Sequence, residues 1–147
     1  MPYAAPGDEQ EIARRCADAM WAGDAASRML GMHVLDVGPG VATVAMRVRE
    51  DMLNGWTTCH GGLIASLADS AFAVACNSRG TVTVAAGFDV SFLEAARLGD
   101  ELVARARETA LRGRSGLYDV TVTRADGTVV AEFRGRSRAT SRTNPGL

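Results

Sequence analysis

The sequence predicts an α+β domain in which a curved antiparallel sheet wraps around one long central helix. A largely apolar segment from Gly61 to about Ser78 has the length of a core helix and ends near a basic residue and a glycine. Strand-like segments bounded by turn residues come before and after it. A chain of 147 residues fits one such domain with a single core.

The first part of the chain, residues 1–27, is expected to form an N-terminal helical extension. From Glu9 to Ala22, apolar residues such as Ile12 and Cys16 recur at helical spacing. A second short helix is expected from about Ala25 to Leu30. This part of the chain therefore adds helices outside the predicted sheet.

Six strands are expected around the central helix. They span approximately residues 32–37, 41–49, 81–93, 101–112, 117–124 and 128–137. Gly38-Pro39-Gly40 joins the first two, and Asp126-Gly127 joins the last two as a hairpin turn. We expect a polar, frayed tail over 139–147. The core of the single domain, 1–147, then covers about residues 28–138.

Composition and charge exclude several functional classes. The net charge is −1, with 16 basic and 17 acidic residues, so we expect no nucleic acid and no membrane as partner. The three cysteines form no CxxC pair and no metal-ligand spacing with histidine, so we expect no metal and no redox cofactor. No basic segment followed by an apolar one is present near residue 1, and the protein is expected to be cytoplasmic.

The predicted central helix carries polar residues along one stripe. Ser66, Asp69, Ser70 and Asn77 are separated by three, four and seven positions, so they lie near one line on its surface. A carboxylate in an otherwise apolar helix is costly unless something polar meets it. This stripe is therefore expected to face a functional site or a polar partner.

Several segments of this region resemble the hotdog-fold acyl-CoA thioesterases, and among them the thioesterases of phenylacetic acid degradation. The segments are Met52-Leu53-Asn54-Gly55, Cys59-His60-Gly61-Gly62, Ser66-Leu67-Ala68-Asp69 and Ala75-Cys76-Asn77-Ser78. The similarity covers about residues 28–138. It implies a homodimer with shared active sites, pairing further into a homotetramer, in which a glycine amide polarises the thioester carbonyl and an aspartate comes from the facing subunit. Asn54 occupies the place of an asparagine that positions water or substrate.

The same residues suit this chemistry on physical grounds. Thioester hydrolysis needs a donor for the oxyanion that develops on the carbonyl, and a carboxylate that activates water or attacks directly. Gly61 and Gly62 offer backbone N–H groups at a helix N-terminus without a side chain in the way. Asp69 lies about 12 Å further along the same helix, too far to serve the same carbonyl. A two-fold dimer with antiparallel helices would bring Gly61 of one subunit beside Asp69 of the other.

The other candidate residues near this segment have less direct roles. We expect His60 to brace the loop before the helix rather than act as a base, and Asn54 either to shape a turn or to contact substrate. Cys59 is not expected to be a nucleophile because no second histidine is placed to activate it. His33 is expected to be incidental, and Ser66 and Ser70 are expected to serve only backbone carbonyls.

Some arginines should contact the phosphates of CoA. The candidates lie on the late strands or their turns and are Arg112, Arg114, Arg134 and Arg136. The sequence also departs from the family at two places. It has Glu94-Ala95 where relatives often have Arg-Pro, and Ala85-Ala86 where some relatives carry a catalytic Ser or Thr. The acyl pocket is therefore expected to differ.

The sequence thus predicts an acyl-CoA thioesterase acting on a small, aromatic acyl group of the phenylacetyl or hydroxyphenylacetyl type. Asp69 would be base or nucleophile and Gly61 the oxyanion donor, with Asn54 and His60 supporting. Two alternatives remain open. One is a noncatalytic acyl-CoA-binding module of the same fold. The other is a dehydratase acting on acyl-CoA or acyl carrier protein, which would require a different acid/base pair, such as a histidine with a glutamate or an aspartate, and no matching histidine is evident on the helix.

Overall fold

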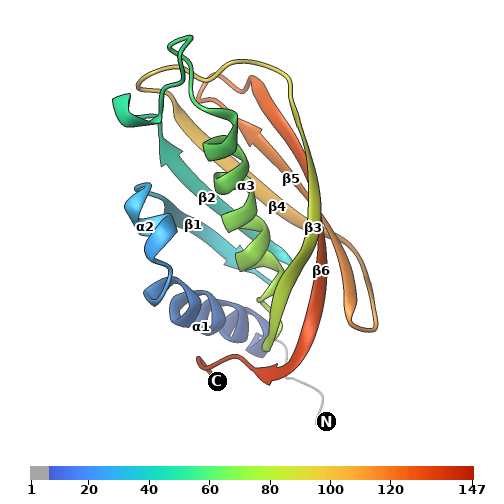
Figure 1. Ribbon diagram of the computed structural model, residues 1–147. Helices are drawn as coiled ribbons and strands as arrows, with labels where there is room; N and C mark the ends of the chain where they lie inside the picture. The colour runs from blue at the N-terminus through green and yellow to red at the C-terminus, as the bar shows by residue number, and fades with distance from the viewer. Residues whose placement is uncertain (1–6) are drawn as a thin grey trace.

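A computed structural model describes residues 7–147, and Figure 1 shows one curved sheet with a long helix lying across it. We expected no secretion signal near residue 1. Residues 1–6 lie outside the described residues. No helix within residues 7–147 is long and apolar enough to cross a membrane.

The sheet has six antiparallel strands in the order β1-β2-β4-β5-β6-β3. The strands are β1 (His33–Gly38), β2 (Val41–Arg47), β3 (Thr81–Phe92), β4 (Glu101–Arg112), β5 (Ser115–Thr123) and β6 (Val129–Thr143). β3 follows the central helix in sequence but lies at the sheet edge beyond β6. The predicted α+β architecture, a curved antiparallel sheet wrapped around one long helix, is confirmed.

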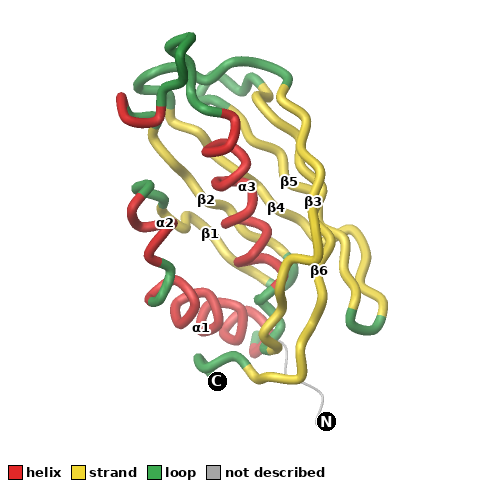
Figure 2. Tube along the Cα trace, in the orientation of Figure 1, coloured by secondary structure: helices red, strands yellow, loops and turns green. Residues whose placement is uncertain are grey.

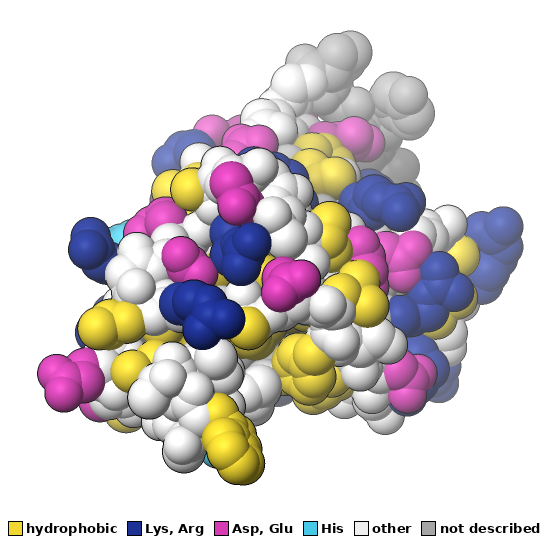
Figure 3. Space-filling model, turned by 90° about the horizontal axis from the view of Figure 1, so that it is seen from above, with side chains coloured by type: hydrophobic (Ala, Val, Ile, Leu, Met, Phe, Trp, Pro, Cys, Tyr) yellow, Lys and Arg dark blue, Asp and Glu magenta, His cyan; other side chains and the backbone are white. Residues whose placement is uncertain are grey.

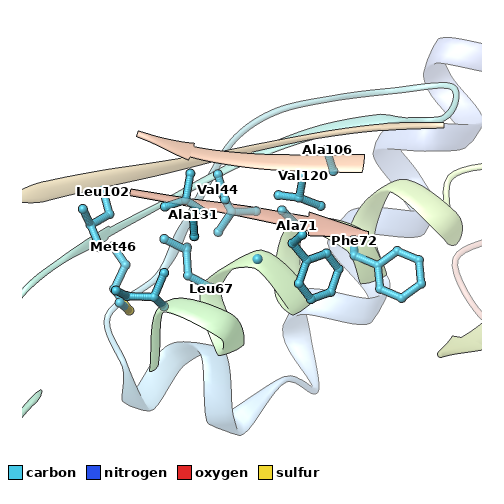
Figure 4. Close-up of a cluster of buried hydrophobic side chains, with 14 of the residues drawn as sticks. Val44, Met46, Leu67, Ala71, Phe72, Leu102, Ala106, Val120 and Ala131 are labelled. Atoms are coloured by element: carbon cyan, nitrogen blue, oxygen red, sulfur yellow. The ribbon is translucent and has the colours of Figure 1, made fainter. Parts of the chain in front are cut away.

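The central helix, α3 (Gly61–Cys76), packs its apolar face against the inner face of the sheet. Figure 4 shows Leu67, Ala71 and Phe72 of this helix pointing toward side chains of the sheet, among them Val44 and Val120. All of these are at most 1% exposed. Burying a side chain of this size contributes about 1.5–3 kcal/mol, so this layer is what fixes the helix on the sheet.

An aromatic cluster fixes the second half of α3. The Phe72 ring lies 5.5 Å from the ring of Tyr118 on β5 and 5.8 Å from that of Phe133 on β6, measured between centroids. A side chain on Gly135 would come within 2.8 Å of the Phe72 ring, so a glycine is needed where the ring approaches the strand. The helix ends earlier than the expected Ser78, because Asn77 caps it and its side chain hydrogen-bonds to Thr83.

The N-terminal helices lie beside β1, at the sheet edge opposite β3. α1 (Asp8–Ala22) runs along the end of the molecule near the C-terminus, and α2 (Ala25–Met29) packs against α3 (Figure 1). Gln10 of α1 donates to the Val37 carbonyl across 2.7 Å, and the Ser27 hydroxyl of α2 lies 2.7 Å from that of Ser70 on α3. The described part of the predicted extension, residues 7–27, therefore contacts the central helix.

The expected frayed tail over 139–147 is wrong. β6 continues to Thr143, which pairs with Thr81 of β3. Asn144 is buried, and its N–H donates to the Gly80 carbonyl across 2.8 Å. The tail is ordered mainly through hydrogen bonds between backbone groups. Such bonds leave no hydrophobic pattern in the sequence, so the polar composition of the tail did not reveal them.

Strand β3 is incompletely covered. It forms an edge of the sheet, and Val84, Phe88 and Phe92 are 47%, 40% and 51% exposed. A long edge strand with exposed apolar side chains is a template for pairing with another chain.

Candidate active site

The first turn of α3 presents two free backbone amides. No oxygen atom of residues 7–147 accepts a hydrogen bond from the N–H of Gly61 or Gly62. The N–H groups of the next two residues, Leu63 and Ile64, donate hydrogen bonds to the His60 carbonyl. Because the positive end of the helix dipole lies here as well, this turn favours a negatively charged oxygen.

Gly61, the first of these two residues, lines a hollow of about 400 Å³. Its lining comes from the loop before α3, from α3 itself and from the segment after β3, and consists of Thr58, Cys59, Gly61, Ile64, Phe92, Leu93, Glu94, Ala95 and Ala96. A side chain on Gly61 would meet the Phe92 ring at 3.0 Å. Figure 3 views this end of the molecule and shows hydrophobic side chains exposed among charged ones. The site therefore combines oxyanion donors with a partly apolar wall.

Three loops gather around this end of α3, as Figure 2 shows. The Cys59 N–H donates to the Ala96 carbonyl across 2.7 Å, and the Arg124 guanidinium donates to the Ala95 carbonyl across 3.0 Å. The segment after β3 is thereby tied both to the loop before the helix and to the β5–β6 turn. Glu94 and Ala95, the departure from the family pattern, line the hollow itself.

Asn54 shapes the loop before the helix. Its side-chain oxygen accepts hydrogen bonds from the backbone N–H groups of Trp56 and Thr58 at 2.9 and 3.2 Å, and its amide donates to the Thr58 hydroxyl across 3.0 Å. This is the turn-forming use of an asparagine. Of the two roles that the sequence left open for Asn54, these contacts favour the first.

His60 is the residue immediately before α3, and it holds the loop through its backbone. Its N–H donates to the Met52 carbonyl across 2.8 Å, while its carbonyl accepts from Leu63 and Ile64. The imidazole is exposed and makes no capping hydrogen bond. His60 thus braces the first turn, with the side chain free to face the solvent.

Cys59 is unsuited to nucleophilic chemistry. Burial raises the pKa of its thiol to about 11, so the thiol stays protonated near neutral pH. Its Sγ lies 3.7 Å from the His60 carbonyl oxygen, and no imidazole is within hydrogen-bond reach among the described residues. His33, the second histidine of the described chain, lies on β1 at the far edge of the sheet.

Asp69 lies two turns after Gly61 on α3, at the side of the helix turned away from the sheet. It is half-buried, and no group of residues 7–147 donates a hydrogen bond to its carboxylate or pairs with it as a cation. Burial raises the pKa of Asp69, and the like charge of Asp24 on α2 raises it further. The carboxylate is therefore poised to accept a proton.

The N-terminal extension contributes a second carboxylate that the sequence did not reveal as part of this region. Asp24 caps α2, accepting from the Ser27 N–H at 3.0 Å and from the Ser27 hydroxyl at 2.7 Å. The same hydroxyl contacts Ser70, next to Asp69. The Asp-x-x-Ser spacing signals a helix cap, but nothing local indicates that the cap lies near Asp69.

One protomer does not assemble the complete predicted site. Gly61, His60 and the Asn54 turn lie together at the start of α3, whereas Asp69 lies about 12 Å further along the helix axis. The phosphate-contact candidates Arg112 and Arg114 lie at the β4–β5 turn, at the other end of the molecule in Figure 1, and Arg134 and Arg136 lie on β6.

Known proteins share both the sequence and the fold. The sequence matches the Thioesterase superfamily over residues 57–131. It is 41% identical over 121 residues to the acyl-coenzyme A thioesterase PaaI of Escherichia coli (strain K12). The aligned segment covers 82% of this chain and 86% of that protein. A structure of the E. coli PaaI protein from the phenylacetic acid degradation operon has a TM-score of 0.90 at 39% identity, covering 91% of this chain and 97% of the other.

A second solved structure resembles the chain more distantly. A Streptococcus mutans protein bound to acetyl CoA has a TM-score of 0.72 at 26% identity and covers 74% of this chain and 88% of its own. Together with the relative of 41% identity, the match to residues 57–131 confirms the hotdog fold and the thioester hydrolase class predicted from the sequence. The chain belongs to the thioesterase superfamily.

Proposed function

We propose that this protein hydrolyses acyl-CoA thioesters and that the acyl group of its substrate is small and aromatic. The observation that carries the proposal is the pair of free amides of Gly61 and Gly62 beside the hollow lined by Phe92 and Leu93. The name of the E. coli relative, an acyl-coenzyme A thioesterase, supports the substrate class. The phenylacetic acid degradation operon named for its structure supports an aromatic acyl group.

The amides stabilise charge that develops during the reaction. As oxygen attacks the thioester, the carbonyl oxygen becomes an oxyanion, and the Gly61 N–H donates to it at the positive end of the helix dipole. CoA leaves as a thiolate and takes up a proton. A carboxylate with a raised pKa can remove the proton from the attacking water, or attack the carbonyl itself to give an anhydride that water then opens.

In our proposal, Asp69 of one subunit supplies this carboxylate to Gly61 of the other. Pairing of two β3 edges would cover the exposed Val84, Phe88 and Phe92 and set the two α3 helices antiparallel. The two-fold axis then creates two equal sites, each with one amide turn and one partner carboxylate. As the family resemblance implies, we further propose that dimers pair into tetramers.

In this scheme Asn54 and His60 do not react with the substrate but hold the oxyanion donors in place. The Asn54 turn and the His60 backbone hydrogen bonds hold the loop that leads into Gly61. A loop held in this way keeps the oxyanion donors aimed at the carbonyl, which matters because displacement by about 1 Å can lower the rate 10²-fold. The reaction proposed here uses no metal and no redox cofactor.

A panel of acyl-CoA thioesters tests the proposed function. We expect phenylacetyl-type and hydroxyphenylacetyl-type thioesters to release free thiol with the highest kcat/KM, because a flat ring suits the wall formed by Phe92 and Leu93. Straight-chain thioesters of similar size serve as controls. Faster hydrolysis of the straight chains would contradict the aromatic assignment. Tight binding of all thioesters without thiol release would instead identify a noncatalytic binding module.

The variant Asp24→Asn is expected to move the acid limb of the pH–rate profile to lower pH. Asp24 raises the pKa of Asp69, so removing its charge lowers that pKa and leaves the base ionised in more acidic solution. Asparagine is as good a helix cap as aspartate, so α2 should remain in place. The measurement is kcat against pH.

Ser27→Ala is the matched control for this prediction. It removes the hydroxyl that links Asp24 to Ser70 but changes no charge. It should leave the acid limb where it is in the unaltered protein. A limb that stays in place in Asp24→Asn, or one that moves equally in both variants, would contradict the electrostatic role of Asp24.

A further inference from the structure

The hollow beside Gly61 has a single charged side chain. Of the nine residues that line it, Glu94 is the only acidic or basic one, and no arginine or histidine of residues 7–147 lines the hollow with it. The Cys59 thiol is neutral because burial raises its pKa to about 11. One carboxylate therefore lies in a hollow whose other side chains carry no charge.

No cation within residues 7–147 neutralises Glu94. It takes part in none of the ion pairs of this part of the chain, and its side chain is exposed. Arg124 donates to the carbonyl of the neighbouring Ala95 across 3.0 Å, but it forms its ion pair with Asp126, at 3.4 Å. Glu94 is held through its backbone, whose N–H donates to the Val130 carbonyl across 3.4 Å. Its carboxylate is therefore available to a ligand.

Glu94 also lies close to the proposed oxyanion donor. A side chain on Gly61 would meet the Phe92 ring at 3.0 Å, and Glu94 follows Phe92 by two residues. Two residues of extended chain span at most about 7 Å. An acyl group whose carbonyl oxygen binds the Gly61 amide can therefore reach Glu94 with its far end.

The two sides of the hollow favour opposite charges. The Gly61 amide, at the positive end of the α3 dipole, favours an anionic oxygen. Glu94 accepts hydrogen bonds and repels anions. An acyl group with an uncharged far end suits both sides when its carbonyl oxygen lies at Gly61. An acyl group that ends in a carboxylate would bring that carboxylate to Glu94, or would place it at the amides instead of the thioester carbonyl.

We infer that Glu94 is a specificity-determining residue that excludes acyl groups ending in a carboxylate, so that the substrates are CoA thioesters of uncharged acyl groups. The inference rests on the proposed function and narrows its substrate class. Placing a like charge against an unwanted ligand is a general way to reject it. The apolar wall of Phe92 and Leu93 also disfavours a carboxylate, because it removes the carboxylate from water. Substitution of Glu94 removes only the part of the exclusion that is due to charge.

The test compares two thioesters of the same shape and different charge. One is 4-carboxyphenylacetyl-CoA, and the other is 4-carbamoylphenylacetyl-CoA, in which a neutral amide replaces the carboxylate. The unaltered protein should have the higher kcat/KM for the carbamoyl thioester. In Glu94→Gln the ratio of the two kcat/KM values should fall about fivefold or more, because the repulsion between two carboxylates is lost. Added salt should lower the ratio in the unaltered protein and leave it nearly unchanged in Glu94→Gln.

Asp36→Asn is the control for a general loss of negative charge. Asp36 lies on β1, at the sheet edge opposite β3, and forms no ion pair within residues 7–147. This variant should keep the ratio of the unaltered protein. An equal fall of the ratio in Asp36→Asn would overturn the inference. So would a ratio in Glu94→Gln within about twofold of the unaltered protein, which would show that shape and desolvation alone exclude the carboxylate.

Binding measurements separate this inference from the proposed function. The Kd of each thioester is measured by calorimetry for Asp69→Asn and for the double variant Asp69→Asn, Glu94→Gln. A smaller ratio of anionic to neutral Kd in the double variant supports the inference even if the unaltered protein hydrolyses neither thioester. An equal ratio would overturn it and leave any observed hydrolysis standing.

A second pair of thioesters makes the test independent of the aromatic ring. Adipoyl-CoA and its neutral monoamide differ in charge in the same way on a straight chain. The result is taken from the pair whose neutral member binds more tightly. If neither neutral thioester binds, the inference and the proposed function both fail.

Discussion

The variant Asp69→Asn should lose at least about 10³-fold in kcat while keeping its fold, as is typical when a general base or its equivalent is removed. Asparagine has the size of aspartate, and Asp69 makes no hydrogen bond or ion pair with residues 7–147 whose loss would unfold the chain. Removing its charge also relieves the cost of burial that raises its pKa. The measurement is kcat for the best acyl-CoA of the panel, with thermal unfolding as the check on folding.

Asp24→Asn is the matched control, since it removes a neighbouring carboxylate charge from the same region. Its kcat at the plateau of the pH profile should remain within about twofold of the unaltered protein, because Asp24 is not proposed to touch substrate. A kcat for Asp69→Asn within about tenfold of the unaltered enzyme would contradict the assignment of Asp69.

A single turnover in ¹⁸O-water distinguishes the two roles left open for Asp69. If the carboxylate attacks the thioester and water then opens the anhydride at the aspartyl carbonyl, the bridging oxygen of Asp69 leaves with the acyl group, so the first acid carries no label and the label enters Asp69. If it activates water, that acid carries the label from the solvent.

The central features of the fold could be predicted because their signals are local. The apolar run of α3, the diglycine at its start and the turn residues of the hairpins all determine structure within a few positions. The diglycine at the start of the helix and the lone carboxylate within its apolar run therefore drew attention to Gly61 and Asp69, and the family resemblance implied their roles. The helix axis converts their separation in sequence directly into distance.

Features that depend on contacts between distant segments were missed. Phe92 meets Gly61 only because β3 crosses beyond β6, and Asp24 approaches Asp69 only because α2 folds back onto α3. The tail was predicted to fray because its polar residues show no period, yet Asn144 is buried through the backbone of Gly80. The partners of the arginines also depend on distant segments. Only the pairing of the strands shows that Arg134 forms an ion pair with Asp119 and Arg136 with Asp89.

Combining two inactive variants in one dimer should restore thioesterase activity that neither variant has alone. Gly61→Pro removes the amide hydrogen that the oxyanion needs. Proline is well tolerated at the first position of a helix, and the preceding His60 has the extended backbone that proline requires, with φ −58° and ψ 129°. Each of Gly61→Pro and Asp69→Asn should be inactive alone, since every site of a homodimer then lacks one group.

A heterodimer of the two chains should regain one working site of its two. The Gly61→Pro chain still carries Asp69, the Asp69→Asn chain still carries Gly61, and across a two-fold interface these intact groups meet once. An equal mixture with random pairing should therefore show about a quarter of the unaltered activity. Differently tagged chains, coexpressed and purified through both tags, give the heterodimer for assay.

Gly61→Ala tests whether the loss in Gly61→Pro comes from the amide or from crowding. Alanine adds a methyl group at 3.0 Å from the Phe92 ring, as proline also does, but keeps the N–H. Because Phe92 is half exposed and can shift, this variant should retain most of its kcat. Purified heterodimers of the two inactive chains that stay inactive, while Gly61→Ala is active, would show that amide and carboxylate do not meet across the interface. The antiparallel dimer is thus tested by a gain of activity that no general loss of stability can imitate.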